Sequence, residues 1–153
     1  MKTKMTLNRV YEFSSAHRLH ASGLSDEQNR QIYDQCNNPQ GHGHDYKLEV
    51  SLIGEPDQKT GMIYALEEMD KLVRQVLNRL DHRHLDKEVA FFKSHVSTGE
   101  VIIQYLWAEL NKIFPVAMLY YLKLWETNNN YFEIGKEVLI EKTKYCETSA
   151  DRR

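Results

Sequence analysis

The chain has 153 residues, of which 41% are hydrophobic and 27% are charged, and its formal net charge is −2. This length suits one domain with a sizeable core, expected over residues 1–153, and excludes intrinsic disorder and a disulfide scaffold. The balance of 20 basic and 22 acidic residues predicts no nucleic-acid partner. With no secretion signal or membrane-length apolar run, we expect a cytoplasmic protein with free thiols. Seven histidines in so short a chain are the feature to explain.

The first third of the chain predicts two strands separated by a polar segment. Apolar and polar residues alternate over residues 5–19, which is the period of a strand. Residues 20–40 are polar and predict a long loop, of a size that is usually functional. Alternation returns over residues 44–52 in the clearest strand pattern of the sequence, and the turn cluster at 54–57 ends it.

Two helices are predicted next. Apolar residues recur at three- and four-residue spacing over 66–80 and again over 102–113, which indicates two helices with one apolar stripe each. Ser97 and Glu100 have the spacing of a capping box before the second helix, and Pro115 ends it.

Strand periodicity then returns until near the end of the chain. Residues 116–126 alternate, with the even-numbered residues predicted to face inward. Residues 131–140 are predicted to form a final strand or pair of strands after an asparagine turn at 128–130. Residues 141–153 are polar and are expected to be a flexible tail.

The order of elements predicts the fold class. Two strands, two helices and two strands indicate an α+β fold, in which two helices cover one face of a four-stranded antiparallel sheet. The other face and the edges of that sheet stay uncovered, and many residues of the third strand are apolar or aromatic on both parities: Leu119, Tyr121 and Trp125 on one, and Tyr120, Leu122 and Leu124 on the other. Because such edges are normally paired or hidden, we expect a symmetric oligomer.

Three histidines are candidate metal ligands. His42 and His44 are two residues apart in an extended segment, so their imidazoles point to the same face. His17 lies at the end of the first strand, and antiparallel pairing would bring it beside them. Three histidines suit a catalytic zinc with an open fourth position. On spacing alone, the alternative of a strand-end histidine and a glycine-rich turn stays open.

A cysteine and an Asp-His pair are candidates for proton transfer. Cys36 lies in the polar segment near the proposed cation, which makes its thiol a candidate reactive group. Asp81 precedes His82 after a helix, and a carboxylate can fix the tautomer of an imidazole for acid or base work. A histidine that follows a helix end is, however, also common for its interaction with the helix dipole.

Glu126 is the acidic residue with the most informative position. It shares the parity of the inward residues of its strand, so its carboxylate should face the interior. An inward acid needs a partner, and a ligand with N–H donors would be one. Glu100 has the simpler interpretation of a capping-box residue.

Five motifs together resemble one family. Residues 13–19, 36–46, 80–86, 97–100 and 126–129 are similar, in order, to the motifs of the 6-pyruvoyltetrahydropterin synthase family. The Cys-Asn-Asn-Pro-Gln-Gly-His-Gly-His block is the most specific, and the similarity covers about residues 10–140. The resemblance implies a T-fold, in which three subunits close a barrel and two trimers form a homohexamer with active sites between subunits.

The resemblance also implies a reaction and its residues. The family converts 7,8-dihydroneopterin triphosphate to 6-pyruvoyl-tetrahydropterin and triphosphate in tetrahydrobiopterin biosynthesis, as a zinc-dependent carbon-oxygen lyase. The implied roles are zinc ligand for His17, His42 and His44, general base for Cys36, proton relay from a neighbouring subunit for Asp81 and His82, and pterin contact for Glu126, Thr98 and Glu100.

The sequence departs from the family pattern in four places. Ser15-Ala16 reverses a common order, and Asp45 and His84 each replace a frequent asparagine. Thr98-Gly99-Glu100-Val101 replaces Thr-Thr-Glu-Asn and removes a hydroxyl and an amide beside the pterin. Two alternatives therefore stay open: 6-carboxytetrahydropterin synthase of queuosine biosynthesis, and a catalytically impaired homologue that binds pterin or zinc. The Cys36 to His42 spacing favours the pyruvoyl branch.

Overall fold

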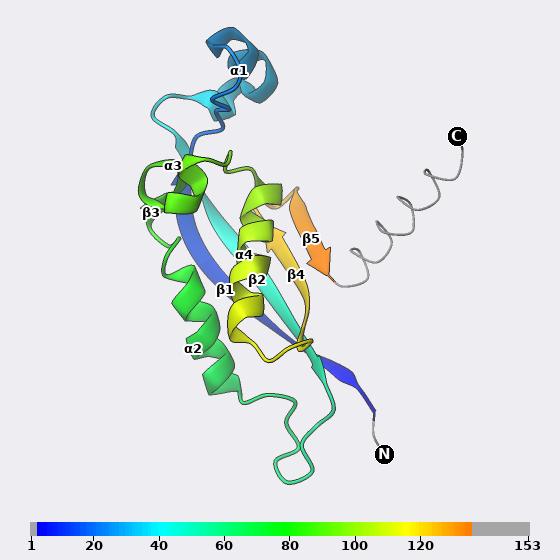
Figure 1. Cartoon of the computed structure of the whole chain (residues 1–153). Helices are drawn as coiled ribbons and strands as arrows, with labels where there is room; N and C mark the ends of the chain where they lie inside the picture. Colours follow the sequence, from blue (N-terminus) through cyan, green and yellow to red (C-terminus); the bar gives the residue numbers. More distant parts are fainter. Residues whose placement is uncertain (1–2, 136–153) are drawn as a thin grey trace, which may run out of the picture.

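The computed structural model describes residues 3–135 (Figure 1). Its elements are β1 (Met5–His17), α1 (Asp26–Tyr33), the 3-10 helix η1 (Asp34–Asn37), β2 (His42–Gly54), α2 (Leu66–Leu77), β3 (Arg83–His84), α3 (Leu85–Glu88), the 3-10 helix η2 (Ala90–Lys93), α4 (Gly99–Ile113), β4 (Leu119–Trp125) and β5 (Tyr131–Gly135). Residues 136–140 of the last predicted strand, and the predicted tail at 141–153, lie outside the described residues. None of the described helices has the length and hydrophobicity that a bilayer crossing needs.

The sheet has five strands in the order β3-β1-β2-β4-β5, and α2 and α4 cover one face of it (Figure 1). The predicted α+β arrangement with two helices on one face is confirmed. The prediction of four strands, all antiparallel, is wrong because β3 pairs with β1 in parallel at Ser15 and Ala16. A strand of two residues is too short to show alternation in the sequence.

The β1 and β2 strands form the longest pairing of the sheet. Their register runs from Met5 opposite Gly54 to His17 opposite His42. The predicted alternation is confirmed, because Phe13 and Tyr46 are buried on the helix side and their rings stack with centroids 5.0 Å apart. This face joins the core beneath α2 and α4.

The β4 strand departs from the predicted parity. Leu122 and Leu124 face inward as expected, but Leu119 is also buried, although it has the opposite parity. A register shift against β2 causes this, since Ser51 pairs with Tyr121 and the next residue, Leu52, pairs with Leu119. The extra residue forms a β-bulge, which exchanges the two faces of the strand at that point.

The polar segment between β1 and β2 is not a structureless loop. It contains α1 and η1, so the predicted loop over residues 20–40 is wrong in part. Ser25 caps α1 and forms a capping box with Gln28, and the buried Asn29 fastens the helix to the preceding turn through Ala21. The Ser25-x-x-Gln28 spacing was the available sequence signal, but α1 has few apolar residues with which to show a helical stripe.

The start of α4 also differs from prediction. Its N-cap is Thr98, and no side chain caps the helix there. The side chain of Ser97 donates instead to Asp86 Oδ1 at 2.6 Å, so the expected capping box with Glu100 does not form. A tertiary hydrogen bond has therefore replaced a local one.

Gly99, the first residue of α4, lies close to β5, and a substitution at this position tests the packing between the two elements. A Cβ at this position would overlap the ring of Phe132 on β5. Alanine is better than glycine in helices by about 1 kcal/mol, but overpacking costs about 1–3 kcal/mol. We therefore expect Gly99→Ala to lower the free energy of unfolding, measured by urea denaturation. In a Phe132→Ala background the same substitution should be neutral or stabilising, and equal destabilisation in both backgrounds would exclude this contact as the cause.

Candidate functional site

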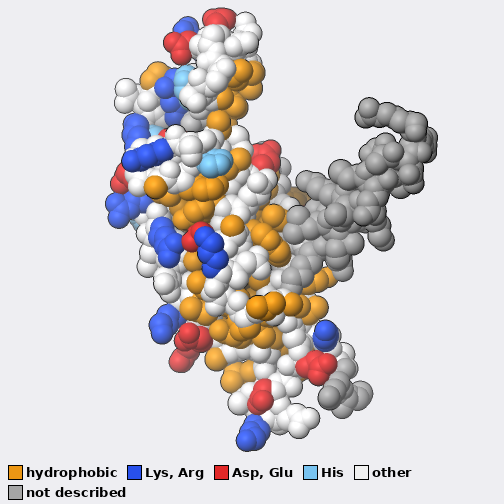
Figure 2. All heavy atoms as spheres, in the orientation of Figure 1, with side chains coloured by type: hydrophobic (Ala, Val, Ile, Leu, Met, Phe, Trp, Pro, Cys, Tyr) orange, Lys and Arg blue, Asp and Glu red, His pale blue; other side chains and the backbone are white. Residues whose placement is uncertain are grey.

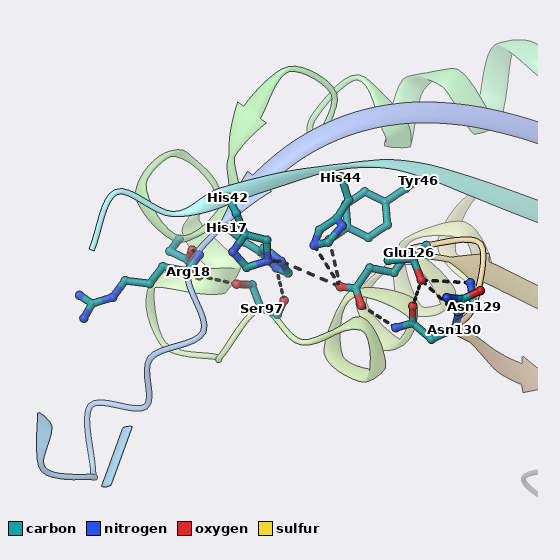
Figure 3. A network of polar contacts seen from close by, with 11 residues as sticks. His17, Arg18, His42, His44, Tyr46, Ser97, Glu126, Asn129 and Asn130 are labelled. Atoms are coloured by element: carbon teal, nitrogen blue, oxygen red, sulfur yellow. Dashed lines mark hydrogen bonds and ion pairs between the residues drawn. The ribbon is translucent and has the colours of Figure 1, made fainter. Parts of the chain in front are cut away.

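Three imidazoles meet where β1 ends and β2 begins (Figure 3). His17 is the last residue of β1, and His42 and His44 lie on the same face at the start of β2. Their ring centroids are 4.6 to 5.1 Å apart, and one nitrogen of each ring lies within 4.8 Å of the others. The structure thus brings together the three histidines that the strand spacing predicts.

A backbone carbonyl fixes the tautomer of His17. Its side chain is buried, and Nδ1 lies 2.7 Å from the carbonyl oxygen of Ser97. Because a carbonyl only accepts, Nδ1 donates its proton, and the lone pair of the neutral ring is at Nε2. That atom lies 3.1 Å from Nε2 of His42. A metal ligand oriented through its other ring nitrogen has this arrangement.

The surroundings favour the neutral form of His17 and His42. Burial lowers the pKa of His17, and the nearby His42 and His44 lower it further. The pKa of His42 is also lowered, first by burial and then by His44. Zinc binds neutral imidazole at about 2.0–2.1 Å, and three such ligands with an open side suit a catalytic ion. The donor set therefore fits a metal ion of this kind.

Glu126 closes one side of the histidine centre. Its Oε1 lies 3.9 Å from Nε2 of His17 and 4.0 Å from Nε2 of His44, and its side chain is only 15% exposed. The Tyr46 hydroxyl donates to Oε1 at 3.4 Å, and Asn130 Nδ2 donates to Oε2 at 2.9 Å. Burial, followed by this carboxylate, raises the pKa of Tyr46, which keeps the phenol a donor. The predicted inward orientation of Glu126 is confirmed.

Cys36 lies on η1 and is half-buried. It lines a hollow of about 940 Å³ together with His42, His44 and Arg18. The 3-10 turn, and a hydrogen bond from the Leu19 amide to the Cys36 carbonyl at 2.9 Å, hold this segment beside the end of β1. The predicted proximity of the thiol to the histidines is therefore seen, although Cys36 lies in a short helix rather than a loop.

Asp81 and His82 occupy a different part of the chain's surface. Asp81 Oδ1 accepts from the Ser14 amide at 2.8 Å and lies 2.9 Å from His82 Nδ1. Both contacts, the Ser14 bond first, lower the pKa of Asp81. The side chain of His82 is 82% exposed, and its φ of 56° is unusual for a residue other than glycine. Neither residue lines the Cys36 hollow, so one chain does not bring the three together.

Two predicted residues lie at the start of α4. Thr98 is the N-cap of that helix, and Glu100 is exposed in its first turn. Neither lines the Cys36 hollow among the described residues. Their predicted contact with a ligand stays a prediction.

Ser97 and Asp86 have roles that the sequence did not reveal. Besides its carbonyl contact with His17, Ser97 donates from its hydroxyl to Asp86. Asp86 Oδ2 in turn accepts from the Arg18 amide at 2.6 Å. These hydrogen bonds attach the end of β1 to the segments that contain Asp86 and Ser97. The capping-box spacing of Ser97 pointed to a local role, and no local pattern marks Asp86.

The chain is similar to known proteins over most of its length. The family model described as "6-pyruvoyl tetrahydropterin synthase" matches residues 6–137. A "6-pyruvoyl tetrahydrobiopterin synthase" of Homo sapiens is 43% identical over 125 residues, which cover 81% of this chain and 86% of the relative. A "putative 6-pyruvoyl tetrahydrobiopterin synthase" of Caenorhabditis elegans is 43% identical over 129 residues, covering 84% and 92% of the two chains.

Solved structures are also similar to this chain. A Caenorhabditis elegans 6-pyruvoyl tetrahydropterin synthase superposes with a TM-score of 0.85 at 41% identity, covering 88% of this chain and 96% of that one. A Plasmodium falciparum protein of the same name has a TM-score of 0.62 at 16% identity, covering 87% and 98%, and this supports the fold alone.

The histidine centre predicts the metal content of the protein. We expect the protein dialysed after incubation with Zn²⁺ to retain about one ion per chain, as three imidazoles at one centre imply. His42→Ala should lose most of it, because two histidines leave the coordination incomplete. Elemental analysis by mass spectrometry measures the ion, and His95→Ala, an exposed histidine elsewhere, is the matched control. Undiminished zinc in folded His42→Ala protein would remove this ligand assignment.

Proposed function

Because the chain belongs to the 6-pyruvoyl tetrahydropterin synthase family, we propose that it converts 7,8-dihydroneopterin triphosphate to 6-pyruvoyl-tetrahydropterin and inorganic triphosphate. In this proposal it is a zinc-dependent carbon-oxygen lyase of tetrahydrobiopterin biosynthesis, and it acts in the cytoplasm. The observation that carries the proposal is the centre of three imidazoles, flanked by a largely buried carboxylate and a thiol.

His17, His42 and His44 hold the metal ion in this mechanism. When bound, zinc supplies Lewis acidity, which polarises the side-chain hydroxyls of the substrate and acidifies the adjacent C–H bonds. Ser97 keeps the His17 ring oriented through its carbonyl. A ligand ring held by such a bond cannot rotate away without losing it, and this preserves the geometry of the centre.

Glu126 anchors the pterin ring. The N–H groups of a pterin edge are donors, and a carboxylate offers two acceptor oxygens on one side. Tyr46 and Asn130 each use one oxygen of Glu126 and so fix the plane of the carboxylate. Thr98 and Glu100 contribute to the same pterin site in this proposal.

Cys36 is the general base that removes a proton from the substrate side chain. Asp81 and His82 of a neighbouring subunit assist it in proton transfer. Both line a hollow other than the Cys36 hollow of their own chain, and the side chain of His82 is 82% exposed, which supports this assignment. Closure of the sheet edges β3 and β5 between subunits would form the barrel of a trimer, and two trimers the homohexamer.

The reaction product tests the proposed function. Protein, zinc and 7,8-dihydroneopterin triphosphate should yield 6-pyruvoyl-tetrahydropterin by mass spectrometry, with one triphosphate released for each pterin. His42→Ala protein provides the background. A carboxytetrahydropterin with acetaldehyde would instead identify the queuosine-pathway activity, and a bound but unchanged substrate would identify a protein that only binds pterin.

Mixed oligomers test the division of the site between subunits. Cys36→Ala and His82→Ala should each retain zinc but lose about 10²-fold or more in kcat, the usual contribution of a positioned acid or base. Co-assembly of the two variants should restore a substantial fraction of the activity, because some sites then combine an intact Cys36 with an intact His82.

The matched control is co-assembly of Cys36→Ala with His42→Ala. These two lesions lie in the same half of the site, so no combination of chains repairs it and activity should stay low. If the first mixture recovers no activity, or if Cys36→Ala alone is active, the assignment of these residues is wrong.

A further inference from the structure

A second hollow, of about 310 Å³, adjoins the hollow that Cys36, His42 and His44 line. It is formed by the segment after β1 together with α3, η2 and the residues that follow η2. Its polar lining is mainly basic: Arg18, His20, Lys87, Lys93 and His95. In Figure 2, basic side chains lie along the side of the molecule on which Figure 1 places α3.

The charge of this hollow favours an anion. Three of its side chains are cationic, whereas the chain as a whole has a net charge of −2, so the concentration of positive charge is local. The acidic residue in the lining, Asp86, already accepts from the Arg18 amide and from Ser97 Oγ, both at 2.6 Å. A concave basic surface of this kind raises the local concentration of anionic ligands.

Arg18 connects this hollow with the histidine centre. Arg18 and Pro39 line both hollows, which therefore adjoin each other. The Arg18 guanidinium donates to the carbonyl and to the side-chain oxygen of Asn37, at 3.0 and 3.2 Å, and these bonds hold it at the junction. An arginine fixed in this way offers its remaining N–H groups to a phosphate.

The positions of Arg18 and Glu126 match the two ends of one ligand. Figure 3 shows Arg18 on the opposite side of the histidines from Glu126. A ligand whose N–H edge contacts Glu126, and whose hydroxyls reach the histidines, extends its far end towards Arg18. In the proposed substrate that far end is the triphosphate.

We propose that Arg18, Lys87 and Lys93 form a polyphosphate subsite that binds the triphosphate of the substrate. This inference rests on the proposed function for the identity of the ligand, and on the charge and position of the hollow for the chemistry. The lysines supply charge over a broad area, while Arg18 orients the phosphate nearest the histidine centre.

The test uses the double variant Lys87→Ala/Lys93→Ala of the full chain. Its matched control is Lys59→Ala/Lys71→Ala, which removes the same charge from exposed positions elsewhere. Titration calorimetry measures the binding of inorganic triphosphate, and steady-state kinetics measures KM and kcat. We expect the Kd of triphosphate and the KM to rise about tenfold or more, which corresponds to about 1.4 kcal/mol. The kcat, and inhibition by unphosphorylated neopterin, should stay within about twofold, since the lysines contact only the phosphates.

Three other outcomes separate the possibilities. Unchanged triphosphate binding in the double variant would overturn the subsite. Weaker triphosphate binding with an unchanged KM would also overturn it, because the hollow would then bind free polyphosphate and not the substrate. If the wild type binds triphosphate through these lysines but does not convert 7,8-dihydroneopterin triphosphate, the subsite stands and the proposed function fails.

Discussion

The register of β1 against β2 is the constraint on which the site depends. It places His17 opposite His42, and the two-residue period of a strand then puts His44 on the same face. A slip of one residue would turn one strand's side chains to the other face, removing Phe13 or Tyr46 from the core along with the histidines. Burial of the core residues therefore also holds the imidazoles together. The histidine centre is therefore the polar end of the hydrophobic face.

Hydrogen bonds attach the end of β1 to a later part of the chain, residues 80–97. Ser14 bonds to Asp81 and His82 through its amide and carbonyl, and the Ser15 hydroxyl donates to the Leu80 carbonyl at 2.6 Å. Further along, His17 bonds to Ser97, and the Arg18 amide to Asp86. This succession of bonds explains why the segment after α2 pairs with β1 as a short parallel strand. It also couples the exposed Asp-His pair to the strand that ends in the histidine centre.

The strand register and the hydrogen bonds at the end of β1 differ in how far the sequence could predict them. The hairpin, the meeting of His17 with His42 and His44, and the inward Glu126 follow from alternation, because in a strand the parity of a residue decides its face. The role of Ser97 could not be predicted, since its partner Asp86 is distant from its local capping pattern and the tertiary bond prevailed. The β-bulge before Leu122 and the helices of residues 20–40 were missed for similar reasons: one depends on pairing between strands, and the other has few apolar residues.

The charged groups around the histidine centre are arranged asymmetrically. Around the three imidazoles, the carboxylate of Glu126 lies on one side and the guanidinium of Arg18 on the other. A ligand with N–H donors at one end and phosphates at the other fits this arrangement in one orientation. The reverse orientation would bring phosphate against a carboxylate and leave the cationic hollow without an anion, and both effects oppose it. On the proposed function, this asymmetry of charge selects the orientation in which the substrate's side-chain hydroxyls reach the histidines and its carbon-bound protons face Cys36.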